Sequence, residues 1–119
     1  HGGDGRAVLR GQATIKMSDG VDVTERMLVG ANQMLKTALG CNADLAVMLE
    51  ISDSCGSHAL YLGDPRRRQY QQGVGLSAAL LLKHGIAVVG SRDARTLHTI
   101  IAALDPSHQP DPEAIDYVE

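Results

Sequence analysis

The sequence predicts an α/β domain of the Rossmann-like, three-layer type, in which a small, mostly parallel sheet is sandwiched by helices. Two apolar runs, residues 44–50 and 86–90, have the near-continuous aliphatic character of strands that are covered on both faces. Helical patterns precede each run and follow the second one, and this alternation implies crossover connections between parallel strands. A chain of 119 residues is long enough for one such domain with its own core.

The first third of the chain contains turns, a short strand and the first long helix. Residues 2–5, Gly-Gly-Asp-Gly, predict a turn, and the alternation over residues 13–17 predicts a strand that ends in a turn at residues 18–20. A helix is expected to begin at Asp22, with Glu25 completing a capping box, and to end at Gly40. Its buried side is defined by apolar residues at helical spacing: Val23, Met27, Leu28, Ala31, Met34, Leu35, Ala38 and Leu39.

The remaining elements follow from similar signals. Residues 58–62 are a second candidate strand, and residues 63–72 form a polar, exposed excursion in which the basic run 66–68 is more typical of a solvated loop than of an anion clamp. A helix is expected from Leu76 to His84. Ser91 is expected to cap a last helix over residues 93–104, with one apolar side buried, comprising Leu97, Ile100, Ile101 and Leu104. We expect residues 1–105 to form the domain and residues 106–119, acidic and proline-rich, to form a mobile tail.

The composition excludes several classes of function. Three tyrosines and no phenylalanine or tryptophan leave an aliphatic core and make base stacking on aromatic side chains an unfavourable binding mode. A net charge of −3 argues against a general nucleic-acid or membrane-surface role. Two cysteines do not make a disulfide framework, so we expect free thiols and a cytoplasmic location. The chain does not open on methionine, which suggests that the natural protein is longer.

The leading candidate for chemistry is the small-residue loop of residues 51–57, Ile-Ser-Asp-Ser-Cys-Gly-Ser. It follows the apolar run 44–50, and the carboxyl ends of parallel strands are where open α/β sheets place their sites. Backbone N–H groups of such a loop could stabilise a Cys55 thiolate, the form that attacks electrophiles and binds soft metals. Ser52 and Ser54 could donate hydrogen bonds to that thiolate or to a substrate. The alternative is a tight turn in which Cys55 is only a small apolar residue and the serines are capping groups.

Other candidates carry weaker signals. Gly73 and Gly75 precede a helix whose first N–H groups would be free to bind an anion or a polar ligand, and Ser77 would face the same ligand; the alternative is a tight turn into the helix. Glu50, at the end of the apolar run, could act as a base, although a charged residue commonly ends a strand. Cys41 is more typical of a structural thiol, and the five histidines have no zinc-motif spacing.

Several motifs together resemble the TudS-like thiouracil desulfidase family, catalogued as domain of unknown function 523. They occur in the family's order over roughly residues 2–92, as if the chain were about the C-terminal three quarters of a member. The most specific is Ser52-x-Ser54-Cys55-Gly56-Ser57, followed by a glycine pair that opens an Ala-Ala-Leu-Leu helix. The others are Gly2-Gly3-Asp4-Gly5, Asp22-Val23-Thr24-Glu25 with Gly30-Ala31, Gly73-x-Gly75-x-Ser77-Ala78-Ala79-Leu80-Leu81, and Gly85-Ile86.

The resemblance implies an α/β fold and an oxygen-sensitive 4Fe-4S cluster held by three cysteines, whose fourth iron takes sulfur from a thiolated nucleobase. A cluster with an open iron position is a Lewis acid that can accept sulfide. Cys55 matches one cluster ligand, as a metal-binding residue, and Ser52 matches a serine proposed to assist catalysis. On this reading Ser54, Gly73, Gly75 and Ser77 contact the substrate.

The sequence also departs from the family pattern. The family's other two cluster cysteines and its catalytic glutamate lie in upstream segments that nothing here matches, Asp53 replaces a loop proline, and Val74 replaces an aspartate. Two hypotheses follow: an iron-sulfur desulfidase whose upstream cysteines lie outside this chain, or a cluster-free, non-catalytic binding or interaction module of the same fold. A third alternative is a thiol enzyme that uses Cys55 without metal, but no histidine has a position from which it could act as its partner. The expected partner is a small-molecule thiolated nucleobase, and a homo-oligomer stays open.

Overall fold

The computed structural model describes residues 3–61 and 68–117 of the chain. Its elements, in order, are helices α1 (Gly5–Leu9) and α2 (Thr24–Gly40), strands β1 (Leu45–Met48), β2 (Ala59–Tyr61) and β3 (Tyr70–Gln72), helix α3 (Leu76–Lys83), strand β4 (Ala87–Gly90) and helix α4 (Ala94–Leu104). In the described part of the chain no helix is both long and apolar enough to cross a membrane.

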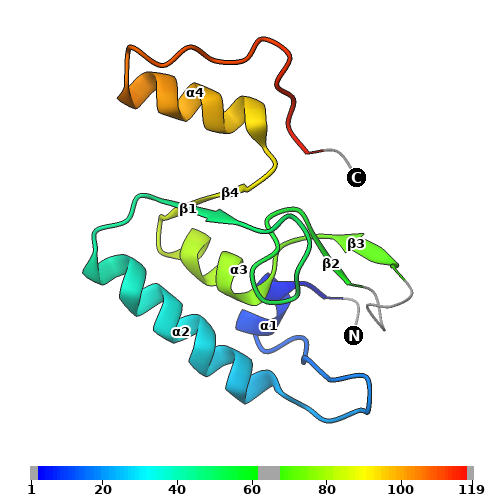
Figure 1. Cartoon of the computed structure of the whole chain (residues 1–119). Coiled ribbons are helices and arrows are strands. Elements are labelled where there is room, and N and C mark those ends of the chain that lie inside the picture. The colour runs from blue at the N-terminus through cyan, green and yellow to red at the C-terminus, as the bar shows by residue number, and fades with distance from the viewer. Residues whose placement is uncertain (1–2, 62–67, 118–119) are drawn as a thin grey trace.

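The two apolar runs form the parallel pair that the sequence predicts. β1 pairs with β4 in parallel, with Leu45 opposite Ala87 and Met48 opposite Gly90. Helices α2 and α3 lie on one side of this pair and α4 lies on the other, so the α/β class with a small parallel sheet between helices is confirmed (Figure 1).

The other two strands form a separate sheet, a β-hairpin. β2 pairs with β3 in antiparallel fashion, with Ala59 opposite Gln72 and Tyr61 opposite Tyr70. The prediction of a strand near residue 60 is therefore confirmed, whereas the prediction that residues up to 72 form only an exposed excursion is wrong. The tilted rings of Tyr61 and Tyr70, 5.5 Å apart, form a cross-strand aromatic pair of the kind that stabilises such a hairpin. The basic residues 66 and 67 lie outside the described residues.

The N-terminal segment forms different elements from those predicted, because side chains bind backbone groups of residues nearby in the sequence. The Asp4 carboxylate accepts hydrogen bonds from the N–H groups of Arg6 and Ala7 and caps α1, where the sequence predicts only a turn. The predicted strand over residues 13–17 is reduced to a single antiparallel bridge between Lys16 and Asp22.

The boundaries of α2 show how local chemistry shifts a helix. Asp22 is not its cap: its carboxylate binds the N–H of Thr24 and forms a turn, so the helix begins at Thr24 behind an uncapped Val23. The helix ends at Gly40, as predicted. The left-handed residue after it is Asn42, with φ of 55°, and the N–H groups of Asn42 and Ala43 bind the carbonyl oxygens of Leu39 and Ala38 in a Schellman motif.

The core is aliphatic, as the composition predicts, and is centred on α3. Leu76 and Leu81 are its largest fully buried side chains, and α3 packs against α1, α2 and β4. From α2, only Ala31 and Leu35 are buried, while Met34 and Leu39 of the predicted buried side are exposed. The sheet contributes Met48 and the partly buried Ala46 and Val88.

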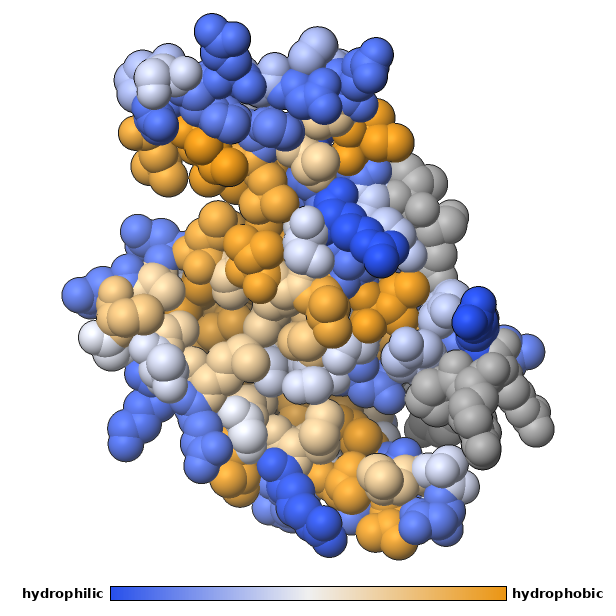
Figure 2. Space-filling model, in the orientation of Figure 1, coloured by the Kyte–Doolittle hydropathy of each residue, from blue (hydrophilic) through white to orange (hydrophobic). Residues whose placement is uncertain are grey.

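Helix α4 buries none of its residues, so the prediction of a buried side over residues 97–104 is wrong. The side of α4 that faces the sheet is hydrophobic, and a hollow lies between them (Figure 2). Ser91 does not cap the helix, because its hydroxyl donates to Glu50. The cap comes instead from the tail, where the Asp116 carboxylate accepts from the N–H and the hydroxyl of Thr96 at 2.8 and 2.6 Å.

The tail has hydrogen-bonded anchors, and its mobility stays a prediction. Besides Asp116, it contributes a Tyr117 N–H that donates to Asp93 at 3.0 Å. The imidazole of His108 stacks on that of His98, with a 2.8 Å hydrogen bond between Nδ1 of His98 and Nε2 of His108. Asp116 and Tyr117 hold the tail to the start of α4, a long-range effect that a proline-rich composition does not reveal. The domain boundary at residue 105 stays a prediction.

Candidate functional site

The Cys55 loop, residues 51–57, connects the end of β1 to β2 and is bound to the start of α3. Three successive N–H groups at that helix terminus donate to loop carbonyls: Gly75 to Gly56 at 2.9 Å, Leu76 to Asp53 at 3.0 Å and Ser77 to Ser54 at 2.6 Å. These are the groups that the sequence predicted to be free for a ligand. The prediction that these N–H groups are free to bind an anion is thus wrong, because they already donate to carbonyl oxygens of the loop.

Glycine is required where these segments touch. A Cβ on Gly75 would lie 2.6 Å from the carbonyl carbon of Ser54 and 2.7 Å from the nitrogens of Cys55 and Gly56. A Cβ on Gly56 would overlap the carbonyl oxygen of Ala59. Gly73, at φ of 145°, has the backbone conformation that favours glycine and lies against the Asp4 side chain. The glycines predicted to bind substrate thus have a demonstrable steric role, and their contact with substrate stays a prediction.

The two predicted loop serines differ in what their hydroxyls do. Ser52 Oγ accepts from the N–H groups of Ser54 and Cys55, both at 3.2 Å, so it holds the turn that carries the thiol. Ser54 Oγ lies 3.5 Å from Ser77 Oγ, which pairs one hydroxyl from the loop with one from α3. The structure therefore brings Ser54 and Ser77 together, while the hydroxyl of Ser52 is directed into its own loop.

Cys55 is a free, half-buried thiol packed against the edge of the core. Cys41 is an exposed thiol at the far end of α2, where it donates to the Ala38 carbonyl. Among the described residues no three of His, Cys, Asp and Glu come together in a way that could hold a metal ion. A 4Fe-4S cluster needs several thiolate ligands, so the residues of this chain do not by themselves fit one.

Asp53 ties the loop to the hairpin. Its carboxylate accepts from the N–H of Tyr61 at 3.0 Å. Burial raises the pKa of Asp53 above its usual range, and the hydrogen bond from Tyr61 opposes this only in part. Keeping the Asp53 carboxylate ionised in the folded protein therefore lowers the free energy of unfolding.

We expect Asp53→Asn to increase the free energy of unfolding at pH 7, because an amide oxygen can still accept the Tyr61 N–H without a buried charge. The wild-type protein loses stability as the pH rises from about 4 through the raised pKa, so the gain should disappear in acid. Denaturant unfolding at pH 3 and pH 7 measures this. Asp22→Asn is the control, because the pKa of Asp22 is lowered by hydrogen bonds from Thr24 and the variant should show no gain at pH 7.

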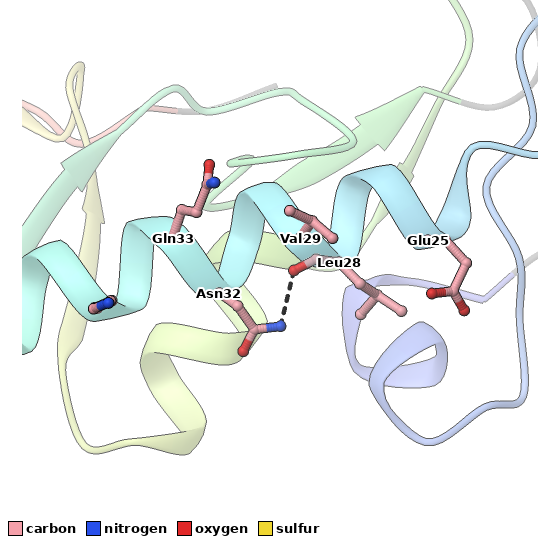
Figure 3. A pocket seen from close by; sticks show the side chains of 6 residues that line it. Glu25, Leu28, Val29, Asn32 and Gln33 are labelled. Carbon is pink, nitrogen blue, oxygen red and sulfur yellow. Dashed lines mark hydrogen bonds between the residues drawn. The ribbon is translucent and has the colours of Figure 1, made fainter.

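A concave surface lies along α2, and no residue of the Cys55 loop lines it. It is lined by residues of that helix alone, and the Asn32 amide donates to the Leu28 carbonyl within it (Figure 3). None of its residues was predicted to act in catalysis or binding; the six are Glu25, Leu28, Val29, Asn32, Gln33 and Lys36.

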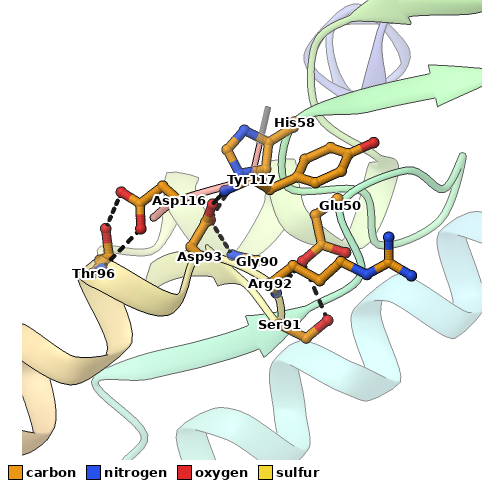
Figure 4. A network of polar contacts seen from close by, with 9 residues as sticks. All are labelled: Glu50, His58, Gly90, Ser91, Arg92, Asp93, Thr96, Asp116 and Tyr117. Atoms are coloured by element: carbon orange, nitrogen blue, oxygen red, sulfur yellow. Dashed lines mark hydrogen bonds and ion pairs between the residues drawn. The ribbon is translucent and has the colours of Figure 1, made fainter. Parts of the chain in front are cut away.

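A polar network lies at the carboxyl ends of the two parallel strands (Figure 4). Glu50, after β1, is buried, and its Oε1 accepts from the Arg92 N–H and the Ser91 hydroxyl after β4. Both partners are donors on the turn after β4, so the contacts in the structure favour a role for Glu50 in joining the strand ends over the alternative role of a base. Gly90 lies among three side-chain oxygens. A Cβ added to Gly90 would lie 2.8 to 2.9 Å from the oxygens of Glu50, Asp93 and Ser57.

Asp93 is the centre of this network, and sequence reasoning missed it as a functional candidate. Its carboxylate accepts from the Gly90 N–H at 2.8 Å, from the Tyr117 N–H at 3.0 Å, and pairs with Nε2 of His58 at 2.7 Å. Burial alone would raise the pKa of Asp93, but the hydrogen bonds from His58, Gly90 and Tyr117 outweigh it and the pKa lies below its ordinary value. No local motif marks a residue whose partners are 24 and 35 positions away.

These features define an α/β protein with a thiol-bearing loop at the carboxyl end of a parallel strand, closed onto the start of a buried helix. The sequence profile of the family described as 2-thiouracil desulfurase matches residues 4–93, and the chain belongs to this family. The uncharacterized protein YbbK of Bacillus subtilis (strain 168) is 38% identical over 92 residues, which are 77% of this chain and 60% of YbbK.

A solved structure gives the same result at the level of the fold. The [4Fe-4S]-dependent thiouracil desulfidase TudS superposes with a TM-score of 0.68 and 30% identity, covering 76% of this chain and 59% of that one. The matched part of the chain spans about three fifths of the length of these relatives. Helix α4 and the tail lie beyond the part that the family profile matches.

Proposed function

We propose that this chain forms part of a desulfidase that removes sulfur from a thiolated nucleobase, and that it supplies one cluster ligand, Cys55, together with the loop that presents it. One observation carries the proposal: in a member of the 2-thiouracil desulfurase family, the Cys55 thiol lies half-buried at the carboxyl end of a parallel strand, in a loop hydrogen-bonded to the start of α3. The remaining ligands of a 4Fe-4S cluster would come from outside these 119 residues.

The chain's own residues have distinct roles in this proposal. Ser52 holds the turn through the N–H groups of Ser54 and Cys55, so its part in catalysis is to fix the thiol in place. The hydroxyls of Ser54 and Ser77 both donate and accept hydrogen bonds, as the carbonyl and N–H groups of a nucleobase require. Gly75 lets the backbones of loop and helix approach closely, and Gly73 leaves room for the side chains of Asp4 and Leu60.

A second function, a cluster-free binding or interaction module, is favoured by one observation. Cys55 is the single thiol at the loop, and the N–H groups at the start of α3 already have partners, so a ligand would meet mostly hydroxyls there. Such a module would bind a thiolated nucleobase without turnover.

Anaerobic reconstitution of the full encoded protein with iron and sulfide separates the two functions. We expect iron uptake with visible charge-transfer absorbance and conversion of 2-thiouracil, and we expect Cys55→Ala to lose both, because a cluster lacking a thiolate is not retained. Cys41→Ala is the matched control and should keep them, since Cys41 lies at the far end of α2. Equal iron contents in the Cys55→Ala and wild-type proteins would remove Cys55 from the ligand set.

A further inference from the structure

After Leu104 the chain turns, and the tail runs back along α4 toward the start of that helix (Figure 1). The tail and α4 both lie outside the part of the chain that the family profile matches. Contacts at two places hold the tail to the helix. Asp116 and Tyr117 hold its end to the start of α4, and the imidazole pair of His98 and His108 holds its middle.

The contact between the two imidazoles depends on how many protons they carry. Nδ1 of His98 lies 2.8 Å from Nε2 of His108, and the two ring planes are inclined by 19°. One nitrogen has to donate its hydrogen and the other has to accept with its lone pair, so at least one ring must be neutral. When both imidazoles are protonated, both nitrogens are donors, and two like charges face each other at hydrogen-bond distance. The contact is therefore lost in the doubly protonated state.

Two charged groups flank this pair, one from each segment. Asp105, in the turn after α4, attracts a protonated His108. Arg95 lies one helical turn before His98 and disfavours a proton there. Helix α4 buries none of its residues, so the described helices and strands of the sheet and core do not pack over the pair. Asp105 and Arg95 oppose each other in their effect on the first proton, and neither can restore an acceptor once both rings are protonated.

The contacts at the end of the tail respond to acid differently. Hydrogen bonds from Thr96 hold the pKa of Asp116 below its ordinary value, and for Asp93 hydrogen bonds outweigh burial in lowering the pKa. Both carboxylates therefore stay ionised at pH 5. A protonated His58 pairs more strongly with the Asp93 carboxylate than a neutral one does (Figure 4). Mild acid thus leaves the end of the tail in place.

We propose that His98 and His108 form a pH-sensitive clasp, which holds the middle of the tail on α4 near neutral pH and opens when both imidazoles are protonated. The closed clasp accepts one added proton and the open clasp accepts two, so the closed form loses stability as the pH falls through about 6.5, the ordinary pKa of imidazole. This difference of one proton lowers the ratio of closed to open clasp about 30-fold between pH 7.5 and pH 5.0. Acid thus converts the middle of the tail into a loop that is tethered only at its two ends.

Nitrogen-15 relaxation of the whole chain tests the clasp, because order parameters report backbone mobility directly. We expect the order parameters of the amides of residues 107–114 to fall from about 0.85 at pH 7.5 to below about 0.6 at pH 5.0, while those of Thr96 and Tyr117 do not change. His108→Gln should abolish the fall, since a glutamine amide can bond to either a neutral or a protonated His98. His108→Ala should leave the middle of the tail mobile at both pH values.

His84→Gln is the matched control, because His84 bonds to the Leu80 carbonyl within α3, and the variant should keep the pH response of the wild type. The order parameters of α3 show whether each variant is folded. The proposal is overturned if the wild-type tail is equally ordered at both pH values, or if His108→Gln loosens in acid as the wild type does. It is also overturned if His108→Ala keeps an ordered tail at pH 7.5, or if Thr96 and Tyr117 lose order together with the middle of the tail.

Discussion

Gly75→Ala is expected to lower the free energy of unfolding by about 3 kcal/mol and to release the Cys55 loop from α3. The added methyl group would meet backbone atoms of Ser54, Cys55 and Gly56 at 2.6 to 2.7 Å, and backbone cannot move aside as the end of a flexible side chain can. Separation of the two segments would lengthen the hydrogen bonds that Gly75, Leu76 and Ser77 donate to the loop.

Two measurements check this expectation. Denaturant unfolding gives the stability, and the rate of Cys55 alkylation in a Cys41→Ser background reports the loop, which should react faster once released. Gly30→Ala is the matched control, since no atom lies within 4 Å of its added Cβ and alanine favours a helix by about 1 kcal/mol. A Gly75→Ala protein with wild-type stability and alkylation rate would show that loop and helix are not in contact in solution.

The fold class could be predicted because its signals are local and strong. The aliphatic runs of β1 and β4 and the helical periodicity of α2 each lie within one short segment, and the parallel pairing follows from their alternation. The Cys55 loop could be located for the same reason. Its position after a buried strand and its glycine neighbours are features of sequence alone.

The roles within the site could not be predicted, because they depend on contacts between distant segments. The N–H groups of α3 are occupied by a loop about twenty residues earlier, and nothing in Gly73-x-Gly75 distinguishes an occupied helix terminus from a free one. Helix α4 illustrates the same limit for packing. Its periodicity correctly predicts a helix with an apolar side, but periodicity does not say whether that side has a partner.

Asp93→Ala is expected to reduce the free energy of unfolding by about 3 kcal/mol, because it removes one acceptor from three donors at once. The Gly90 N–H, the Tyr117 N–H and the His58 imidazole would all lose their partner, and Asp93 itself is only 5% exposed. These donors belong to the end of β4, the tail and the exit of the Cys55 loop. The loss should therefore increase amide exchange at Tyr117 as well as lowering global stability.

The pH dependence of stability separates the contribution of the Asp93 charge from that of the side chain's shape. Because the pKa of Asp93 is lowered in the folded protein, its contribution is present above about pH 4 and is lost as the pH falls through the folded-state value. The stability difference between wild type and Asp93→Asn should therefore be large at pH 7 and shrink toward pH 2. Asp105→Ala is the control, since the Asp105 carboxylate binds only exposed groups of Ser107 and the variant should change little. A difference for Asp93→Asn that stays constant from pH 7 to pH 2 would mean that the shape of the side chain matters and that its charge does not.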